Sequence, residues 1–204
     1  DPGDPAHTRD TIEAALPLIE AAGGRAFILF TSHRALSEGG AYLKGRVAGP
    51  APYPILTQGE APRELLLRQF RELGNAVLLG TGSFWEGVDV KGEALSIVVI
   101  DKLPFASPDD PLLKARLEGI KRRGGNGFVE HQLPQAVLAL KQGVGRLIRD
   151  ARDFGVIVLC DPRLRTKSYG RTFIASLPPM PLTQDRREAI QFLESRLYRP
   201  GAAS

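Results

Sequence analysis

The chain is 204 residues long and combines 43% hydrophobic with 25% charged residues, a composition that excludes a disordered or membrane-embedded class and predicts a soluble globular protein. Lysine and arginine number 27 against 23 aspartate and glutamate, so the net charge of +4 is compatible with a nucleic-acid partner but too small to indicate one. One cysteine, Cys160, excludes a disulfide framework; the histidines lack metal-ligand spacing and no apolar stretch reaches the ~20 residues that span a bilayer, so we predict no metal site and a cytoplasmic location.

Short apolar runs alternate with amphipathic segments along the whole chain. Each run is bounded by turn residues and is apolar throughout, as expected of a strand that is buried on both faces of a parallel sheet. The predicted strands are residues 26–30, 53–56, 76–79, 95–100 and 156–160. The predicted helices are residues 8–22, 35–43, 62–73, 112–123, 134–149, 166–175 and 183–197. The alternation predicts an α/β fold whose mostly parallel central sheet is covered by helices on both faces.

Ligands of such sheets bind where the strands end. The loops at 31–34, 80–89 and 101–110 are therefore the expected ligand-binding loops. Asp101 follows the fourth predicted strand where a Walker B acid would stand, but Lys102 replaces the catalytic carboxylate that should come next. We therefore expect Asp101, and likewise the acid that follows the fifth strand, Asp161, to cap the turns at their strand ends.

The end of the helix predicted at residues 134–149 combines glycines with arginines. Its sequence is Gln142-Gly143-Val144-Gly145-Arg146-Leu147-Ile148-Arg149. Each glycine costs a helix about 1 kcal/mol relative to alanine, but it also lets another backbone or a phosphate approach closely. Arg146 and Arg149 are three residues apart, so on a helix both guanidinium groups project from one side and suit a phosphate chain. An exposed basic helix end would explain the arginines but not the glycines.

Residues 80–92 form a predicted glycine-rich loop. Gly82 and Gly87 have the spacing of a phosphate-binding P-loop, but Val88 and Asp89 stand where that motif requires lysine and serine or threonine. No other segment of the sequence supplies the motif. The arginines are therefore expected to complete a nucleotide site that another domain provides, in the manner of arginine fingers.

Three stretches together resemble a known enzyme family. Residues 142–149 resemble motif VI (Q-x-x-G-R-x-x-R) of superfamily 2 helicases, and residues 28–32 resemble motif IV. Residues 81–89 resemble motif V in the form used by the DinG/XPD-like branch. The sequences at 101–105 and 167–170 are most similar to those of the bacterial DinG-type enzymes called YoaA. The motifs occur in the family's order, and the resemblance covers nearly the whole chain.

The resemblance implies a RecA-like three-layer fold and the second motor domain of an ATP-dependent DNA helicase, of 5′→3′ polarity, acting in DNA repair. It implies a linker and leading helix at 1–24, the RecA-like domain at 25–182, and a C-terminal helix and tail of the same domain at 183–204. It also implies that ATP and Mg²⁺ bind mainly to a preceding motor domain of the same polypeptide, and that a 4Fe–4S cluster belongs to that part of the protein. The chain by itself is not expected to hydrolyse ATP.

The resemblance also assigns roles to individual residues. Arg149 is the expected γ-phosphate finger, with Arg146 beside it and Gln142 ordering the motif or contacting a phosphate. The residues expected on the nucleotide side are Glu86, Gly87, Asp89 and Gly145. Asp89 would contact the ribose or pair with an arginine. Alternatively, the carboxylates of Glu86 and Asp89 could serve only to cap a helix or order their loop.

Single-stranded DNA is the expected partner, and it would cross the ends of the strands. The residues expected to contact it are Thr31, Ser32, Arg34, Thr81, Gly82, Ser83, Phe84 and Trp85. The two aromatic rings could stack on bases, although packing between loop and sheet explains Trp85 better. A basic run could add charge to the track or form only a solvated helix face. That run consists of Lys114, Arg116, Lys121, Arg122 and Arg123.

Two other functions remain open on the sequence. The chain could be a non-catalytic nucleic-acid-binding or partner-docking domain of the same fold, although the intact set of acids, glutamine and arginines argues against a bare scaffold. It could also be a self-contained nucleotide-binding enzyme, against which the missing P-loop counts.

Overall fold

A parallel β-sheet forms the centre of the molecule. The computed structural model describes residues 2–47, 52–85, 94–145, 147 and 154–197. Within these residues the strands run in the order β2-β3-β1-β4-β5, and every neighbouring pair is parallel. The strands are β1 (Ala26–Phe30), β2 (Ile55–Thr57), β3 (Val77–Thr81), β4 (Ile97–Ile100) and β5 (Val156–Leu159). Because all are parallel, their carboxyl ends meet at one edge of the sheet.

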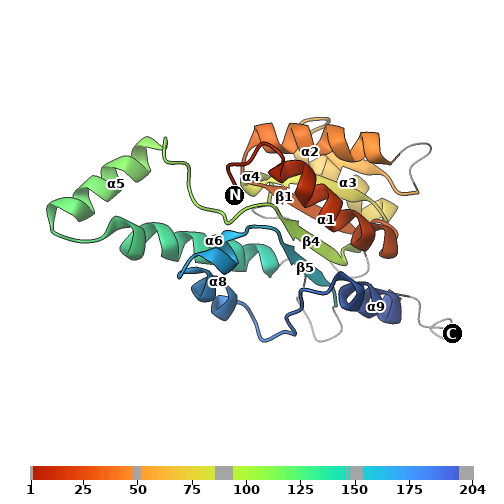
Figure 1. Ribbon diagram of the computed structural model, residues 1–204. Helices are drawn as coiled ribbons and strands as arrows, with labels where there is room; N and C mark the ends of the chain where they lie inside the picture. The colour runs from red at the N-terminus through yellow and green to blue at the C-terminus, as the bar shows by residue number, and fades with distance from the viewer. Residues whose placement is uncertain (1, 48–51, 86–93, 146, 148–153, 198–204) are drawn as a thin grey trace.

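Two layers of helices cover the two faces of the sheet. Successive residues of a strand point to opposite faces. On β1, Phe27 and Leu29 face a core formed with α3 (Arg63–Leu73), α6 (Leu133–Val144) and α8 (Gly170–Ser176). Ile28 and Phe30 face a core formed with α1 (His7–Ala21), α2 (His33–Arg46) and α9 (Arg186–Leu197). Figure 1 shows α1 and α2 on the opposite side of the sheet from α6 and α8, which confirms the predicted three-layer α/β fold.

Four further helical elements lie in the connections between these strands and helices. They are α4 (Gly82–Trp85), α5 (Pro111–Arg122), the π-helix η2 (Phe128–Gln132) and α7 (Arg163–Thr166). Helix α5 projects from the body of the molecule, and the chain returns along η2 and α6 (Figure 1). The Asp110 side chain accepts a hydrogen bond from the Leu112 amide at 2.8 Å, and Pro111 fits the first turn, where an amide hydrogen is not needed.

The helix predicted at residues 134–149 differs most from the observed structure. It begins earlier, because η2 runs directly into α6, and α6 ends at Val144 with Gly145 as its C-cap. The prediction that one helix continues to Arg149 is therefore wrong, in keeping with the low helix propensity of the two glycines in this turn. The prediction of one continuous helix at 166–175 is also wrong, because α7 ends at Thr166 and α8 begins at Gly170. Among the described residues, no helix has both the length and the apolar character needed to cross a membrane.

Candidate functional site

A cavity of about 410 Å³ lies at the carboxyl ends of β1, β3 and β4. Its walls include Thr31 and Ser32 after β1, Thr81 and Gly82 at the end of β3, and Gln142 on α6. The structure thus brings together five sequence-predicted site residues that are spread over more than half of the chain. Ligand sites of open parallel sheets occur in this position.

The wall after β1 is suited to an anionic group. Ser32 is the N-cap of α2, and its Oγ accepts a hydrogen bond from the Ala35 amide at 3.2 Å. The 14-residue helix therefore begins at the cavity, where its free amides and dipole favour negative charge. Arg34 lies exposed in the first turn of the same helix. Together these groups can hold a phosphate.

The wall at the end of β3 contains a residue that the sequence did not single out. The Gln58 side-chain oxygen accepts a hydrogen bond from the Thr81 amide at 2.7 Å and another from its hydroxyl at 3.1 Å. Gln58 directly follows β2, so the rule that selected the other strand-end loops would also have selected it. Both donors of Thr81 already bind Gln58 here, which leaves the exposed Gly82 as the accessible backbone of this wall.

Phe84 does not lie in the cavity. Its side chain is 4% exposed and packs edge-on against Phe27, with ring centroids 6.5 Å apart. The Arg63 guanidinium carbon lies 5.8 Å from the centre of the same ring. The expectation that Phe84 stacks on a base is therefore wrong in this structure, because its ring is part of the core. The side chains of Ser83 and Trp85 lie outside the described part of the structure.

Motif VI is described only in part. Gln142 is exposed on the last turn of α6 and lines the cavity, and Gly145 is exposed at the C-cap. Five predicted site residues lie outside the described residues: Glu86, Gly87, Asp89, Arg146 and Arg149.

The basic residues of α5 and of its C-cap, Arg123, are all exposed. Three of them have an acidic partner, in the pairs Lys114–Asp109, Arg122–Glu118 and Arg123–Glu130. These pairs favour a solvated helix face for those three residues, because exposed ion pairs reduce the charge left for a phosphate backbone.

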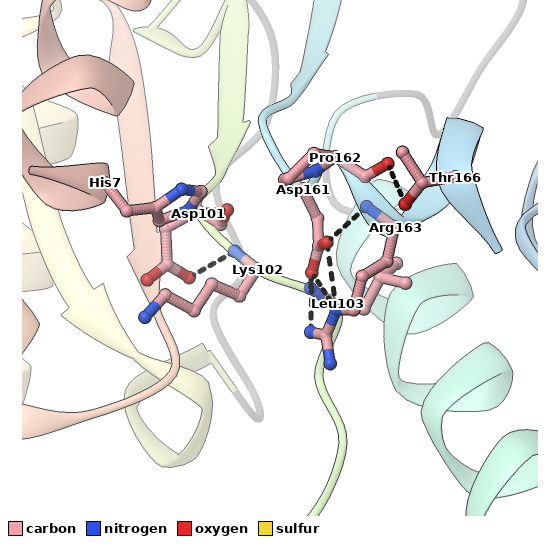
Figure 2. Close-up of polar contacts among 8 residues, drawn as sticks. All are labelled: His7, Asp101, Lys102, Leu103, Asp161, Pro162, Arg163 and Thr166. Atoms are coloured by element: carbon pink, nitrogen blue, oxygen red, sulfur yellow. Dashed lines mark hydrogen bonds and ion pairs between the residues drawn. The ribbon is translucent and has the colours of Figure 1, made fainter. Parts of the chain in front are cut away.

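Asp101, at the end of β4, is fully buried and only half satisfied. Its Oδ1 accepts a hydrogen bond from the Lys102 amide at 2.6 Å, and its carbonyl oxygen lies 2.8 Å from His7 Nε2 (Figure 2). Its Oδ2 has no hydrogen-bond partner among the described residues. Burial raises the pKa of Asp101 to about 6, although the amides of Lys102 and Thr31 partly oppose that shift. The predicted turn-capping role is confirmed.

Asp161, at the end of the neighbouring strand β5, is fully satisfied. Its Oδ2 accepts from the Leu103 amide at 2.7 Å and from Arg163 Nη2 at 2.6 Å, and its Oδ1 accepts from the Arg163 amide at 2.9 Å (Figure 2). Burial by itself raises the pKa of Asp161, but the hydrogen bonds from Arg163 and Leu103 outweigh it and hold the pKa below its ordinary value. Asp161 therefore caps its turn, as predicted, and also holds the loop after β4.

These features define a class of protein: an α/β domain of the RecA-like fold with a cavity at the carboxyl ends of its parallel strands. Residues 15–180 match the helicase C-terminal domain family, and the chain belongs to that family.

Known proteins agree with this assignment. The chain is 54% identical over 189 residues to the ATP-dependent DNA helicase YoaA of Escherichia coli (strain K12), an alignment that covers 93% of this chain and 29% of that protein. It is 44% identical over 162 residues to the ATP-dependent helicase DinG of Mycobacterium tuberculosis (strain ATCC 25618 / H37Rv), covering 79% and 24%. A solved XPD helicase structure superposes with a TM-score of 0.59 at 22% identity and covers 86% of this chain and 32% of its own. The chain thus spans less than a third of the length of these relatives.

Proposed function

We propose that this chain is the second motor domain of an ATP-dependent DNA helicase. One observation carries the proposal: residues of the three helicase-like motifs, Ser32, Gly82 and Gln142, line a single cavity at the strand ends. A helix N-terminus opens into the same cavity and favours a phosphate. The described residues include no group of three or more His, Cys, Asp or Glu placed to hold a metal ion, so Mg²⁺ and an iron–sulfur cluster are proposed for other parts of the protein.

The proposal divides the work between two motor domains. ATP and Mg²⁺ bind mainly to the first, and Arg149 and Arg146 of this chain reach the γ-phosphate when the two close. Gln142, Gly145, Glu86, Gly87 and Asp89 complete the nucleotide side. Single-stranded DNA contacts the strand-end loops through Thr31, Ser32, Gly82 and Arg34, mainly by its phosphates.

The proposed domain limits follow the same division. Residues 1–24 provide a linker and α1, 25–182 the RecA-like domain, and 183–204 a C-terminal helix and tail of the same domain. Support comes from α9, whose Leu193 is fully buried in the core that α1 and α2 share.

The decisive experiment replaces Arg149 by alanine in the full-length protein. Because a finger stabilises charge that develops in the transition state, Arg149→Ala should lower the DNA-stimulated ATPase rate by about 10³-fold while ATP and DNA affinities change little. Arg187→Ala is a matched control, since Arg187 is an exposed arginine on α9. Unchanged turnover in Arg149→Ala would remove the finger assignment, and a wild-type protein without DNA-stimulated ATPase activity would favour a non-catalytic binding domain.

A further inference from the structure

The loop that follows β4 forms a wall of the strand-end cavity. Lys102, Pro104 and Phe105 all line that cavity. The described hydrogen bonds inside this loop are few, and the Phe105 amide bonds only locally, to the Leu103 carbonyl at 2.8 Å. The position of the wall therefore depends on groups outside the loop.

Asp161 and Arg163 provide those groups from the neighbouring strand end. Asp161 reaches across from β5 and accepts the Leu103 amide hydrogen at 2.7 Å. Arg163 holds the same carboxylate in place through its Nε, at 3.0 Å from each oxygen, and its Nη2, at 2.6 Å (Figure 2). The Asp161 side chain is 2% exposed and that of Arg163 is 26% exposed, so water competes little for the carboxylate.

Arg163 also contacts the wall directly. Its guanidinium carbon lies 5.2 Å from the centre of the Phe105 ring, within the range of a cation–π interaction. That ring stacks on Phe128 of η2 with centroids 5.8 Å apart, and it meets Tyr169 and Phe173 edge-on at 5.8 and 5.7 Å. One arginine thus fixes two points of the wall, the Leu103 amide through Asp161 and the Phe105 ring.

We propose that Arg163 is a positioning residue for the strand-end cavity. Together with Asp161 it sets the place of the loop formed by residues 102–105, and thereby the shape of the cavity that Ser32, Gly82 and Gln142 complete. Arg163 does not line the cavity. Its effect on DNA therefore passes through the loop, and this inference rests on the proposed helicase function of that cavity.

The Asp161–Arg163 pair depends on the exact side chains at both positions. A lysine at position 163 keeps the positive charge but loses the planar fork that binds both carboxylate oxygens and lies against the ring. An asparagine at position 161 keeps one acceptor oxygen but places an amide donor at the other, although hydrogen-bond donors face both oxygens of Asp161, and it removes the charge opposite the guanidinium. Either change should release the loop. Because the two residues act as one unit, the double variant should do little more than each single one.

The test uses the full-length protein with Arg163→Lys, Asp161→Asn and both together. Arg46→Lys is the matched control, because Arg46 makes a similar two-point contact with Glu13 on the far side of the sheet, away from the cavity. Amide hydrogen exchange at Leu103 should become roughly tenfold faster in the three variants and stay unchanged in the control. The single-stranded DNA concentration that half-saturates the ATPase should rise roughly five- to tenfold, with ATP affinity within about twofold of wild type.

A purely structural role predicts a different result. If the variants lower only the melting temperature and keep the wild-type DNA concentration for half-saturation, the positioning role is overturned. If a variant at position 161 or 163 does not fold, Phe105→Leu replaces it in the test. This change removes the ring face that Arg163 contacts and keeps an apolar side chain. If the DNA concentration that half-saturates the ATPase is unchanged in Phe105→Leu, the proposal is also overturned. If wild type shows no DNA-stimulated ATPase, the proposed function fails. The hydrogen exchange of the Leu103 amide still tests whether Asp161 and Arg163 hold the loop formed by residues 102–105.

Discussion

The ends of β4 and β5 present the same side chain in two opposite states. Asp101 and Asp161 are both buried side chains at strand ends, and the two strands, β4 and β5, are hydrogen-bonded neighbours. Asp161 has both oxygens bonded and a guanidinium beside it, and its pKa is lowered. Asp101 has one oxygen without a partner among the described residues, and its pKa is raised to about 6.

The difference shows that burial alone does not decide whether a carboxylate stabilises or destabilises the folded state. A buried charge is costly unless a partner and hydrogen bonds compensate it. Asp161 has that compensation and can hold a neighbouring loop. Asp101 lacks part of this compensation, so its ionised form destabilises the folded state at neutral pH. The same substitution should therefore change stability in opposite directions at the two strand ends.

Asp161→Asn should have the largest effect. It removes the negative charge that Arg163 faces and replaces one of the two acceptor oxygens by an amide donor, so the free energy of unfolding at pH 7 should fall by about 2–4 kcal/mol. Urea denaturation of the 204-residue chain, which contains both core layers, measures this. Asp109→Asn, at an exposed acid paired with Lys114, is the control. A loss no greater than that of the control would contradict the comparison.

Asp101→Asn should show the opposite sign. The folded state keeps the Asp101 proton up to about pH 6, whereas the unfolded chain releases it near pH 4, so the contribution of this group to stability is complete below about pH 4 and is lost as the pH rises through about 6. The asparagine variant should equal wild type near pH 4 and exceed its unfolding free energy by about 1–2 kcal/mol at pH 8. Denaturation midpoints from pH 4 to 8 measure this. A variant less stable than wild type at pH 8 would show that Asp101 is compensated after all.

His7→Ala should have a smaller effect at the same strand end. It removes the contact between the imidazole and the Asp101 carbonyl oxygen, 2.8 Å apart, and should cost about 1 kcal/mol of unfolding free energy. His7→Gln can restore a donor at a similar distance and should recover part of the loss. Equal losses in both variants would mean that the ring contributes by packing rather than by its hydrogen bond.

Glu13→Gln should have the smallest effect. Hydrogen bonds from Arg46 and Tyr42 lower the pKa of Glu13 to about 2, but the Glu13 and Arg46 side chains are both largely exposed. Water and salt screen such pairs, so stability should change little, and any change should shrink at high ionic strength. A loss as large as that of Asp161→Asn would show that partner number, not burial, separates the two carboxylates.

Local pattern made most of the fold predictable. Every strand that the structure describes overlaps a predicted one, because short apolar runs that are bounded by turn residues and alternate with amphipathic segments indicate the strands of a parallel sheet. Thr31, Ser32 and Gly82 were predicted to lie at the strand ends, since parallel strands bring their carboxyl ends to one edge. The end of α6 was misjudged because apolar periodicity continues past the glycines, whereas the helix ends at Val144 and the Leu147 amide bonds to the Val144 carbonyl in a turn.

The sequence by itself determined the α/β alternation, the helicase-like motifs and the edge of the sheet at which the site lies, because each depends on residues that are close together in the chain. Only the tertiary structure decided which side chains meet there. Gln58 reaches Thr81 across 23 residues, Asp161 reaches Leu103 across 58, and the Phe84 ring turns into the core. These partnerships follow from how the strands align and how the core fills, so no local spacing distinguishes the aspartate that holds a loop from the one that lacks a second partner.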